Sequence, residues 1–440
     1  MPAPVTVAAL FRQNRSFTKL YLARLVSLLG DWFNMLAIIA LLRDLGEVGA
    51  GGVGWLLIFK TLPSLAMTPF AGAAADRYPR RNLMMATDLA RALVVLAMFL
   101  TLIWPSTTLV YLLVILQSSL SAFFEPARQA LLPDIVSPEE LTTANAIGAA
   151  TWSAMLTVGA ALGGLFTARF GWQLALVVDA LSYLISMLFL IDLVEPPRPA
   201  RLEAPNPSLA SSLGLIEARA GLRYALRRPR ILSLMLVKAG WCVAGGITLV
   251  LTVLGERVYP IEGEPMLGVA LLYSARGLGT AAGPFLGRWW SDNEPAAMER
   301  LILPGFLCGA AFYVVLALVE SPALAAAVVV IAHFGGSLNW VFSTIRLQQL
   351  VPSEVRGRVF ALEQGLFTAM LSVSTWSYGW CIDHEAFRLE TAPMLLGLSL
   401  TVPSACWLAR GLVLGWGGEA AEREALLTVE SSSYTPKSAP

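Results

Sequence analysis

The chain has 440 residues, of which 56% are hydrophobic and only 14% charged, and its formal net charge is +1. Soluble domains carry about 25% charged residues, so the charges here are too few to cover the surface of a soluble protein of this length. The composition therefore excludes a soluble enzyme.

Apolar runs long enough to cross a bilayer recur along the whole chain. A spanning helix needs about 20 mostly apolar residues. Such runs occur at 17–42, 52–75, 82–104, 106–130, 143–168 and 172–194, and again at 231–256, 266–290, 299–319, 322–347, 359–382 and 392–415. We therefore predict an all-α polytopic membrane protein with twelve transmembrane helices in two six-helix halves. The first run is too long for a secretory signal peptide and is expected to remain as a span.

The predicted halves cover residues 1–194 and 231–416, joined by a linker at 195–230. The linker begins with prolines, which oppose a helix. From Ser211 onward, leucines lie on one helical face and arginines on another, a pattern typical of an amphipathic helix on the membrane surface. The alternative for this helix is a docking site for a soluble partner. Residues 417–440 are expected to be a disordered tail.

Basic residues in short loops predict the orientation. They gather before the first run, after the second, after the tenth and in the linker, all of which fall on one side if the spans alternate. Because cytoplasmic loops are enriched in Lys and Arg, both termini and the linker are predicted to be cytoplasmic in a plasma (inner) membrane protein.

Two sequence matches indicate a duplicated half. The segment Pro69–Gly72 recurs at Pro284–Gly287, 215 residues later, and Ser137–Glu140 has its counterpart at Val351–Glu354. Parallel repeats are a transporter architecture with the substrate site near mid-membrane between the halves. Ser137 and Glu140 are also spaced to form a capping box at a helix start.

Ionisable residues inside the spans are the main functional candidates, since each costs at least about 2.5 kcal/mol to insert. Asp31 lies near the middle of the first run, where a desolvated carboxylate is suited to bind protons or a cationic substrate. The alternative is a structural ion pair with Arg24. Asp179 in the sixth run is a weaker candidate.

Two acid–base pairs have the spacing of neighbours on one helical face. Asp88 precedes Arg91, and Glu125 precedes Arg128, each by three residues. Both pairs are expected near the cytoplasmic end. We predict a charge network that latches the two halves in one state and breaks in the other, with simple intrahelical pairing as the alternative.

The loop after the second run carries the most specific motif. Gly72–Arg81 reads GAAADRYPRR and resembles the cytoplasmic signature G-x-x-x-D-R-x-G-R-R of the major facilitator superfamily, with Pro79 in place of a glycine. Phe123–Pro133 and Val351–Phe360 are similar to the subgroup that contains the enterobactin exporter and macrolide efflux proteins. The resemblance implies a drug:proton antiporter-like exporter that works by alternating access.

Three groups of candidate residues result, the first two resting on the in-membrane charges and this resemblance. The proton or substrate candidates are Asp31, Glu125, Glu363, Arg24, Lys238, Arg276 and Asn339. The latch candidates are Gly72, Asp76, Arg77, Arg80, Arg81, Asp88, Arg91 and Arg128. Glycines four residues apart permit close helix contact, and the packing candidates are Gly159, Gly163 and Gly164.

The predicted function is a secondary exporter of amphiphilic small molecules (drug-, macrolide- or siderophore-like) that exchanges them for protons. The alternatives are a lysophospholipid or other lipid transporter and, more remotely, a non-transporting scaffold or sensor. The partners expected are the substrate, protons and membrane lipid, for a chain that acts as a monomer. We expect no enzyme activity, cofactor or nucleic-acid partner, because the chain has no phosphate loop and no hydrolase motif. The scattered cysteines and two histidines predict no metal site.

Overall fold

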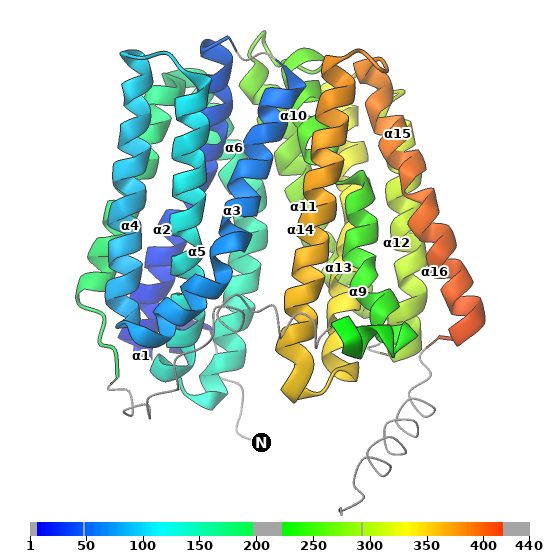
Figure 1. The fold of residues 1–440 in the computed structure, drawn as a ribbon, viewed down its shortest axis with the longest axis horizontal. Helices are drawn as coiled ribbons and strands as arrows, with labels where there is room; N and C mark the ends of the chain where they lie inside the picture. The colour runs from blue at the N-terminus through cyan, green and yellow to red at the C-terminus, as the bar shows by residue number, and fades with distance from the viewer. Residues whose placement is uncertain (1–6, 47–48, 197–221, 292–293, 417–440) are drawn as a thin grey trace, which may run out of the picture.

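The structure is a computed structural model, and it describes residues 7–46, 49–196, 222–291 and 294–416. Most of these residues are helical, and the helices form two bundles (Figure 1). The first half consists of α1 Val7–Gln13, α2 Arg15–Asp44, α3 Ala50–Arg77, α4 Arg80–Ala97, η1 Met98–Leu102, α5 Thr107–Ile135 and α6 Pro138–Ile191. The second half consists of α9 Pro229–Trp241, η2 Cys242–Ala244, α10 Ile247–Arg257, α11 Pro265–Ser291, α12 Pro295–Leu316, α13 Pro322–Leu350, α14 Ser353–Asp383, η3 Leu389–Thr391, α15 Ala392–Ser399 and α16 Thr401–Leu414.

The membrane-length segments agree with the predicted twelve. In the described ranges, nine helices are long and apolar enough to cross a bilayer. One of them, α6, contains two segments, because Gly171 has non-helical angles (φ 80°, ψ 166°) between them. Two further helices, α11 and α14, have 27 and 31 residues and are therefore about 40 and 46 Å long at 1.5 Å per residue. The all-α fold with six segments in each half is confirmed.

We call the end of the molecule where α1 lies the α1 end, and the other end the opposite end. Helix α1 and the starts of α2, α4 and α9 lie at the α1 end, whereas α3, α11 and α15 begin at the opposite end (Figure 1). The predicted linker helix begins within 197–221, outside the described residues, and its later part is described as helical at 222–226. The predicted tail at 417–440 lies outside the described residues.

Local capping starts several helices as the sequence indicates. The Ser137 hydroxyl accepts a hydrogen bond from the Glu140 amide, and the Glu140 carboxylate accepts one from the Ser137 amide, so the predicted capping box is present. The equivalent segment Val351–Glu354 starts α14, which is the fifth segment of the second half as α6 is of the first. The repeat therefore places the same element at the same point in each half.

The seventh segment is broken, where the sequence predicts one continuous helix at 231–256. Helix α9 ends at Trp241, a 3₁₀ turn follows, and α10 begins at Ile247. The Ser374 hydroxyl of α14 accepts a hydrogen bond from the Gly246 amide (2.9 Å) and donates one to the Val243 carbonyl (2.8 Å). Backbone groups released at a break inside a membrane must find such partners, and α14 supplies one.

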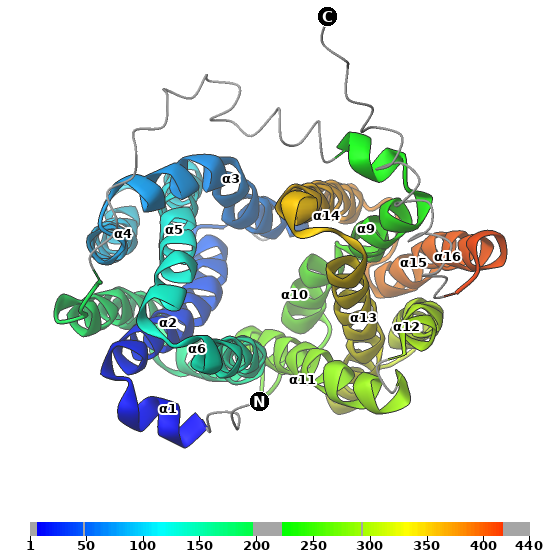
Figure 2. The same ribbon diagram turned by 90° about the horizontal axis from the view of Figure 1, so that it is seen from below.

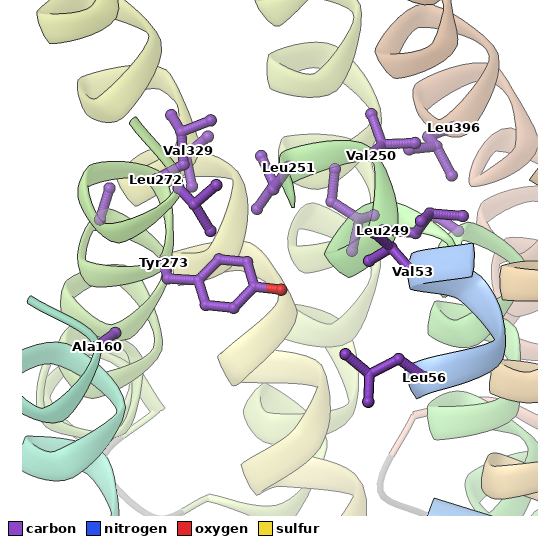
Figure 3. Packing of buried hydrophobic residues seen from close by; sticks show 14 of the residues in the cluster. Val53, Leu56, Ala160, Leu249, Val250, Leu251, Leu272, Tyr273, Val329 and Leu396 are labelled. Carbon is purple, nitrogen blue, oxygen red and sulfur yellow. The ribbon is translucent and has the colours of Figure 1, made fainter. Parts of the chain in front are cut away.

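The halves meet along two helix pairs, α3 with α14 and α6 with α11 (Figure 2). The Ser274 hydroxyl of α11 donates to the Thr157 carbonyl of α6 (3.0 Å), and Gly164 of α6 packs on Ala270 of α11. Leu249 of α10 lies beside Val53 and Leu56 of α3 in the buried core (Figure 3). All these contacts lie between mid-membrane and the opposite end.

The outward faces of the helices are apolar. Leu412 and Val413 of α16 have 78% and 81% of their surface exposed, and Leu318 after α12 has 78%. A soluble protein rarely exposes large contiguous apolar patches, whereas hydrocarbon requires them. The structure therefore fits a bilayer as its solvent.

Candidate functional site

A group of polar residues lies inside the first half near mid-membrane. Asp31 and Asn34 come from α2, Lys60 from α3, and Asp179 and Tyr183 from α6. We call these five residues the acidic cluster. The Tyr183 hydroxyl donates to Asp31 (2.6 Å), and the Lys60 ammonium donates to the Asn34 side-chain oxygen (2.7 Å). The cluster thus ties three helices together through polar contacts.

Asp179 is the most deeply buried acid of this cluster. It has no exposed surface, and neither carboxylate oxygen has a hydrogen-bond partner among the described residues. Its Oδ1 lies only 2.8 Å from the position that a Cβ of Gly30 would occupy. Gly30 therefore leaves the room that brings Asp179 close to the turn of α2 that carries Asp31. Charged neighbours of Asp179 are Asp31, Lys60 and Arg91.

Tyr183 connects the acidic cluster to a buried ion pair. The Gln117 side-chain amide donates to the Tyr183 hydroxyl (3.1 Å), and the Arg91 guanidinium lies 4.2 Å from the centre of the Tyr183 ring. Arg91 pairs with Asp88, which also accepts from the Ser186 hydroxyl (2.6 Å). The predicted Asp88–Arg91 pair is present, but it is bound to α6 and buried within the first half.

Glu125 binds two arginines at once. It pairs with Arg128 on its own helix, as the spacing predicts, and with Arg24 of α2. The ion pair of Arg24 is therefore with Glu125 and not with Asp31, which removes the structural alternative for Asp31. Asp31 remains partly accessible and bonded to a neutral tyrosine.

In the second half, Lys238 and Glu363 form a buried ion pair. The Lys238 Nζ and Glu363 Oε1 are 3.1 Å apart, with 8% and 2% of their side chains exposed. The ammonium also lies 4.6 Å from the centre of the Trp340 ring. Each charge is neutralised by the other, so neither is an open binding group in this state.

Asn339 lies in a different place from the one expected. With its amide correctly oriented, it donates to the Ile302 carbonyl (2.7 Å) and accepts from the Phe306 amide (3.3 Å). It is 1% exposed and packs on Gly305 of α12. The expected place of Asn339 on the pathway is corrected by these contacts, which bind it to the backbone of the outer helix α12.

The described latch residues contact only the first half. Arg80 pairs with Asp134, and Arg81 donates to the carbonyls of Ile191 and Leu193. The amides of Arg80 and Arg81 both donate to the Glu195 carboxylate (3.1 Å each), which caps α4. Arg77 is exposed, and the surroundings of Gly72 and Asp76 lie outside what the structure describes.

The three packing glycines serve two different contacts. Gly159 and Gly163 lie against Trp32 of α2, inside the first half, whereas Gly164 lies against Ala270 and Met266 of α11. Neighbouring glycines on α6 thus face both its own half and the other.

A pocket of about 230 Å³ lies between the halves, and we call it the central pocket. It is lined by Met35, Leu57, Ile58, Lys60, Thr61, Thr248, Leu371, Ser372 and Thr375. Arg276, a predicted candidate, reaches it indirectly, since its guanidinium donates to the Thr248 hydroxyl (2.7 Å). Lys60 belongs to both this pocket and the acidic cluster, so the two are adjacent.

Sequence reasoning missed that Asp179 and Lys60 are charged neighbours, and it missed a second buried group. Glu299 of α12 pairs with Arg346 of α13 and Arg410 of α16, and all three are buried. The only signal in the sequence is a charge inside an apolar run. Helix packing decides which charges meet, and the spacing of residues in the sequence does not predict these pairs.

The family model of the Major Facilitator Superfamily matches residues 20–375 of the chain. The chain is 25% identical to the uncharacterized MFS-type transporter YfiS of Bacillus subtilis, covering 82% of this chain and 85% of YfiS. It is 28% identical to the multidrug efflux pump Tap of Mycolicibacterium fortuitum, covering 76% and 83%. The solved structure of a bacterial homologue of the human lysosomal transporter Spinster, inward-facing and unoccupied, has the same fold at 16% identity (TM-score 0.69, covering 92% and 99%). The two halves, their central pocket and the family match together show that the chain belongs to the Major Facilitator Superfamily of transporters.

Proposed function

We propose that this transporter is a proton-coupled exporter of amphiphilic small molecules. The observation that carries the proposal is the acidic cluster beside the central pocket, because it joins ionisable groups to a cavity that is lined by both halves. Substrate sites of such repeat transporters lie at this depth. The similarity to the efflux pump Tap supports export as the direction.

Asp179 and Asp31 are the proposed proton carriers. An ionised carboxylate that is buried without hydrogen bonds is strongly disfavoured, so Asp179 is suited to hold a proton when the pocket is empty. Asp31 is partly accessible and one helical turn from the pocket residue Met35 on α2. Protons can thus be exchanged at Asp31 against a positive group of the substrate.

The proposed orientation places the α1 end in the cytoplasm. Arg80 and Arg81 lie there, and basic loops favour the cytoplasmic side of a plasma (inner) membrane. Because the contacts between halves lie toward the opposite end, the state described would then be closed outward and open to the cytoplasm. In this state the described basic loop residues contact their own half. This is expected if the latch between the halves is open on the cytoplasmic side.

Transport into proteoliposomes with an imposed pH gradient tests the proposal. Siderophores, macrolides, dyes and lysolipids form the substrate panel. We expect Asp179→Asn and Asp31→Asn to lose pH-driven accumulation, because a side-chain amide cannot take up and release a proton as a carboxylate does. Asp179→Asn should keep substrate-for-substrate exchange without a gradient, which shows that the protein is folded.

Asp192→Asn is the matched control, since Asp192 is exposed and pairs with Lys19 at the α1 end. Wild-type-like pH-driven transport in both Asp31→Asn and Asp179→Asn would refute the proton role.

A second candidate function is lipid transport, and one observation favours it. A pocket of about 200 Å³ opens between α3 and α14 near the opposite end and is lined by Trp55, Trp376 and Trp380, each 43–50% exposed. Aromatic rings at a membrane-facing seam can admit a lipid chain sideways. Lysolipid uptake that continues without a pH gradient, with no drug or dye efflux, would favour this function.

A further inference from the structure

The central pocket presents hydrogen-bond donors from both halves. Lys60 comes from α3, Thr248 from α10 and Ser372 from α14. Thr248 follows the break between α9 and α10, and Arg276 donates to its hydroxyl oxygen. The hydroxyl hydrogen of Thr248 is therefore free to donate into the pocket.

Two of these donors have unused capacity. An ammonium has three N–H donors, and Lys60 uses one of them, on Asn34. The Lys60 ammonium forms no ion pair within 4 Å among the described residues. The Ser372 hydroxyl is buried and has no hydrogen-bond partner there. Buried polar groups normally have partners, so these donors are suited to bind a hydrogen-bond acceptor in the pocket.

The group that fits these donors is an acceptor. Among the described residues no carboxylate lines the central pocket, and the remaining lining is apolar or hydroxylic. An ammonium and two hydroxyls that line one pocket from three helices match the oxygens of an acidic group, since charge-assisted hydrogen bonds are the strong ones.

We propose that this transporter binds a zwitterionic amphiphile, with its acidic group held by Lys60, Thr248 and Ser372 and its amine at Asp31. The amine assignment rests on the proposed proton exchange. An anion bound at Lys60 alone would be favoured when Asp31 and Asp179 are protonated, so it would travel together with protons. An amine and a proton compete for the Asp31 carboxylate. Such competition is required if substrate and protons are to cross the membrane in opposite directions.

All charged groups around Asp31 agree with this assignment. Lys60 of α3 and Asp179 of α6 are its nearest charged companions in the cluster, and Tyr183 of α6 is its hydrogen-bond donor. Arg91 is occupied by Asp88, and Arg24 by Glu125. Asp31 is therefore the accessible acid of the cluster that has no cation already bound to it.

The geometry limits the size of the charged part of the substrate. Asp31 precedes Met35 by one turn of α2, a rise of about 6 Å. Two extended residues span about 7 Å, so the amine and acid of a dipeptide have a suitable separation. A pocket of about 230 Å³ is below the usual range for whole drug-sized ligands. It therefore encloses the acidic end, and the apolar body extends toward the α1 end.

Equilibrium binding of four matched probes to the purified full chain tests the proposal. The probes are the radiolabelled dipeptide tryptophanyl-leucine (zwitterion), its methyl ester (cation), its N-acetyl form (anion) and the N-acetyl methyl ester (neutral). One charged hydrogen-bonded contact corresponds to a factor of about 10 to 100 in Kd. We expect the zwitterion to bind more tightly than either singly charged probe by at least the lower factor.

Variants assign each charge to its partner. Lys60→Met should lower the affinity for the zwitterion to that for the methyl ester and leave the affinity for the methyl ester unchanged. Ser372→Ala should lower the affinity for the zwitterion to a smaller extent. Asp31→Asn should remove the preference for the amine. Lys60→Arg retains the charge and should retain the preference, and Lys19→Met at the exposed α1 end is the control.

Equal binding of the zwitterion and the methyl ester in the wild type, or an equal loss for all four probes in Lys60→Met, would overturn the proposal. Binding needs no gradient, so this result is separate from the transport test. If the wild-type protein shows no pH-driven transport but keeps the probe preferences, proton coupling and the competition between amine and protons are refuted. The proposed site for the acidic group is then still supported.

Discussion

Glu299 illustrates how a single residue can hold three helices in the second half. Its two carboxylate oxygens lie 3.1 Å from Arg346 Nε and 2.8 Å from Arg410 Nη1, and its side chain has no exposed surface. The Trp407 indole also donates to the Glu299 carbonyl (3.0 Å). Because desolvated charges are stable only when paired, the ion pairs with Glu299 stabilise both buried arginines.

Glu299→Gln should therefore destabilise the protein strongly. Removing one partner of a buried ion pair leaves the other charges uncompensated, at about 3–5 kcal/mol. Thermal unfolding in detergent, read as a shift in Tm, measures the effect. The control is Glu390→Gln, which breaks the exposed pair with Arg388, and exposed pairs contribute little. Equal Tm values for the two variants would contradict the structural role of Glu299.

At the scale of elements, the antiparallel pair α3 and α14 forms one side of the contact between halves. The Asp383 carboxylate at the end of α14 accepts hydrogen bonds from the Ala50 and Gly51 amides at the start of α3 (2.7 Å each). It thus caps the positive end of that helix. A Cβ on Gly51 would overlap this carboxylate, and a Cβ on Gly49 would lie 3.1 Å from it, so the absence of a side chain at Gly51 allows its present position.

Changing Asp383 should loosen the first turn of α3. Asp383→Asn keeps acceptor capacity without the charge, and Asp383→Ala removes both. We expect amide hydrogen exchange at residues 50–53 to rise in the order wild type, Asn, Ala, since these amides open locally when uncapped. Asp44→Asn changes a carboxylate at the same end that accepts a hydrogen bond from Trp172 of its own half, and it should leave this segment unchanged. No increase in Asp383→Ala would show that the cap does not hold the halves together.

At the scale of the whole molecule, close approach of the halves depends on small residues at the α6–α11 contact. A Cβ on Gly164 would overlap the Ala270 side chain and lie 3.1 Å from the Met266 carbonyl. The backbones could not keep their present separation with a larger residue there. The equilibrium between states is therefore sensitive to this position.

Gly164→Val should separate the halves at the opposite end. Spin labels at the exposed positions Arg169 and Glu262, one in each half, should move apart, and transport should fall. Gly148→Val is the matched control on α6, because a Cβ there meets no atom within 4 Å. An unchanged label distance in Gly164→Val would mean that the contact can adapt without opening.

The sequence by itself determined the helices, their number and their division into two halves. These features depend on local composition: apolar runs of spanning length, the Ser137–Glu140 capping box and the matched segments of the repeat. The Asp88–Arg91 and Glu125–Arg128 pairs were also predictable, because residues three apart on a helix are neighbours whatever surrounds them.

Only the tertiary structure decided which distant charges meet. Arg24 binds Glu125 and not Asp31, Asp179 reaches the turn of Asp31 through the space at Gly30, and Asn339 turns toward α12. Each outcome depends on how a helix is rotated and how closely it packs on its neighbours. Many small packing contacts along the whole helix determine its rotation, and the spacing of residues within one segment does not predict it. The acidic cluster and the central pocket exist because those contacts bring α2, α3, α6, α10 and α14 together.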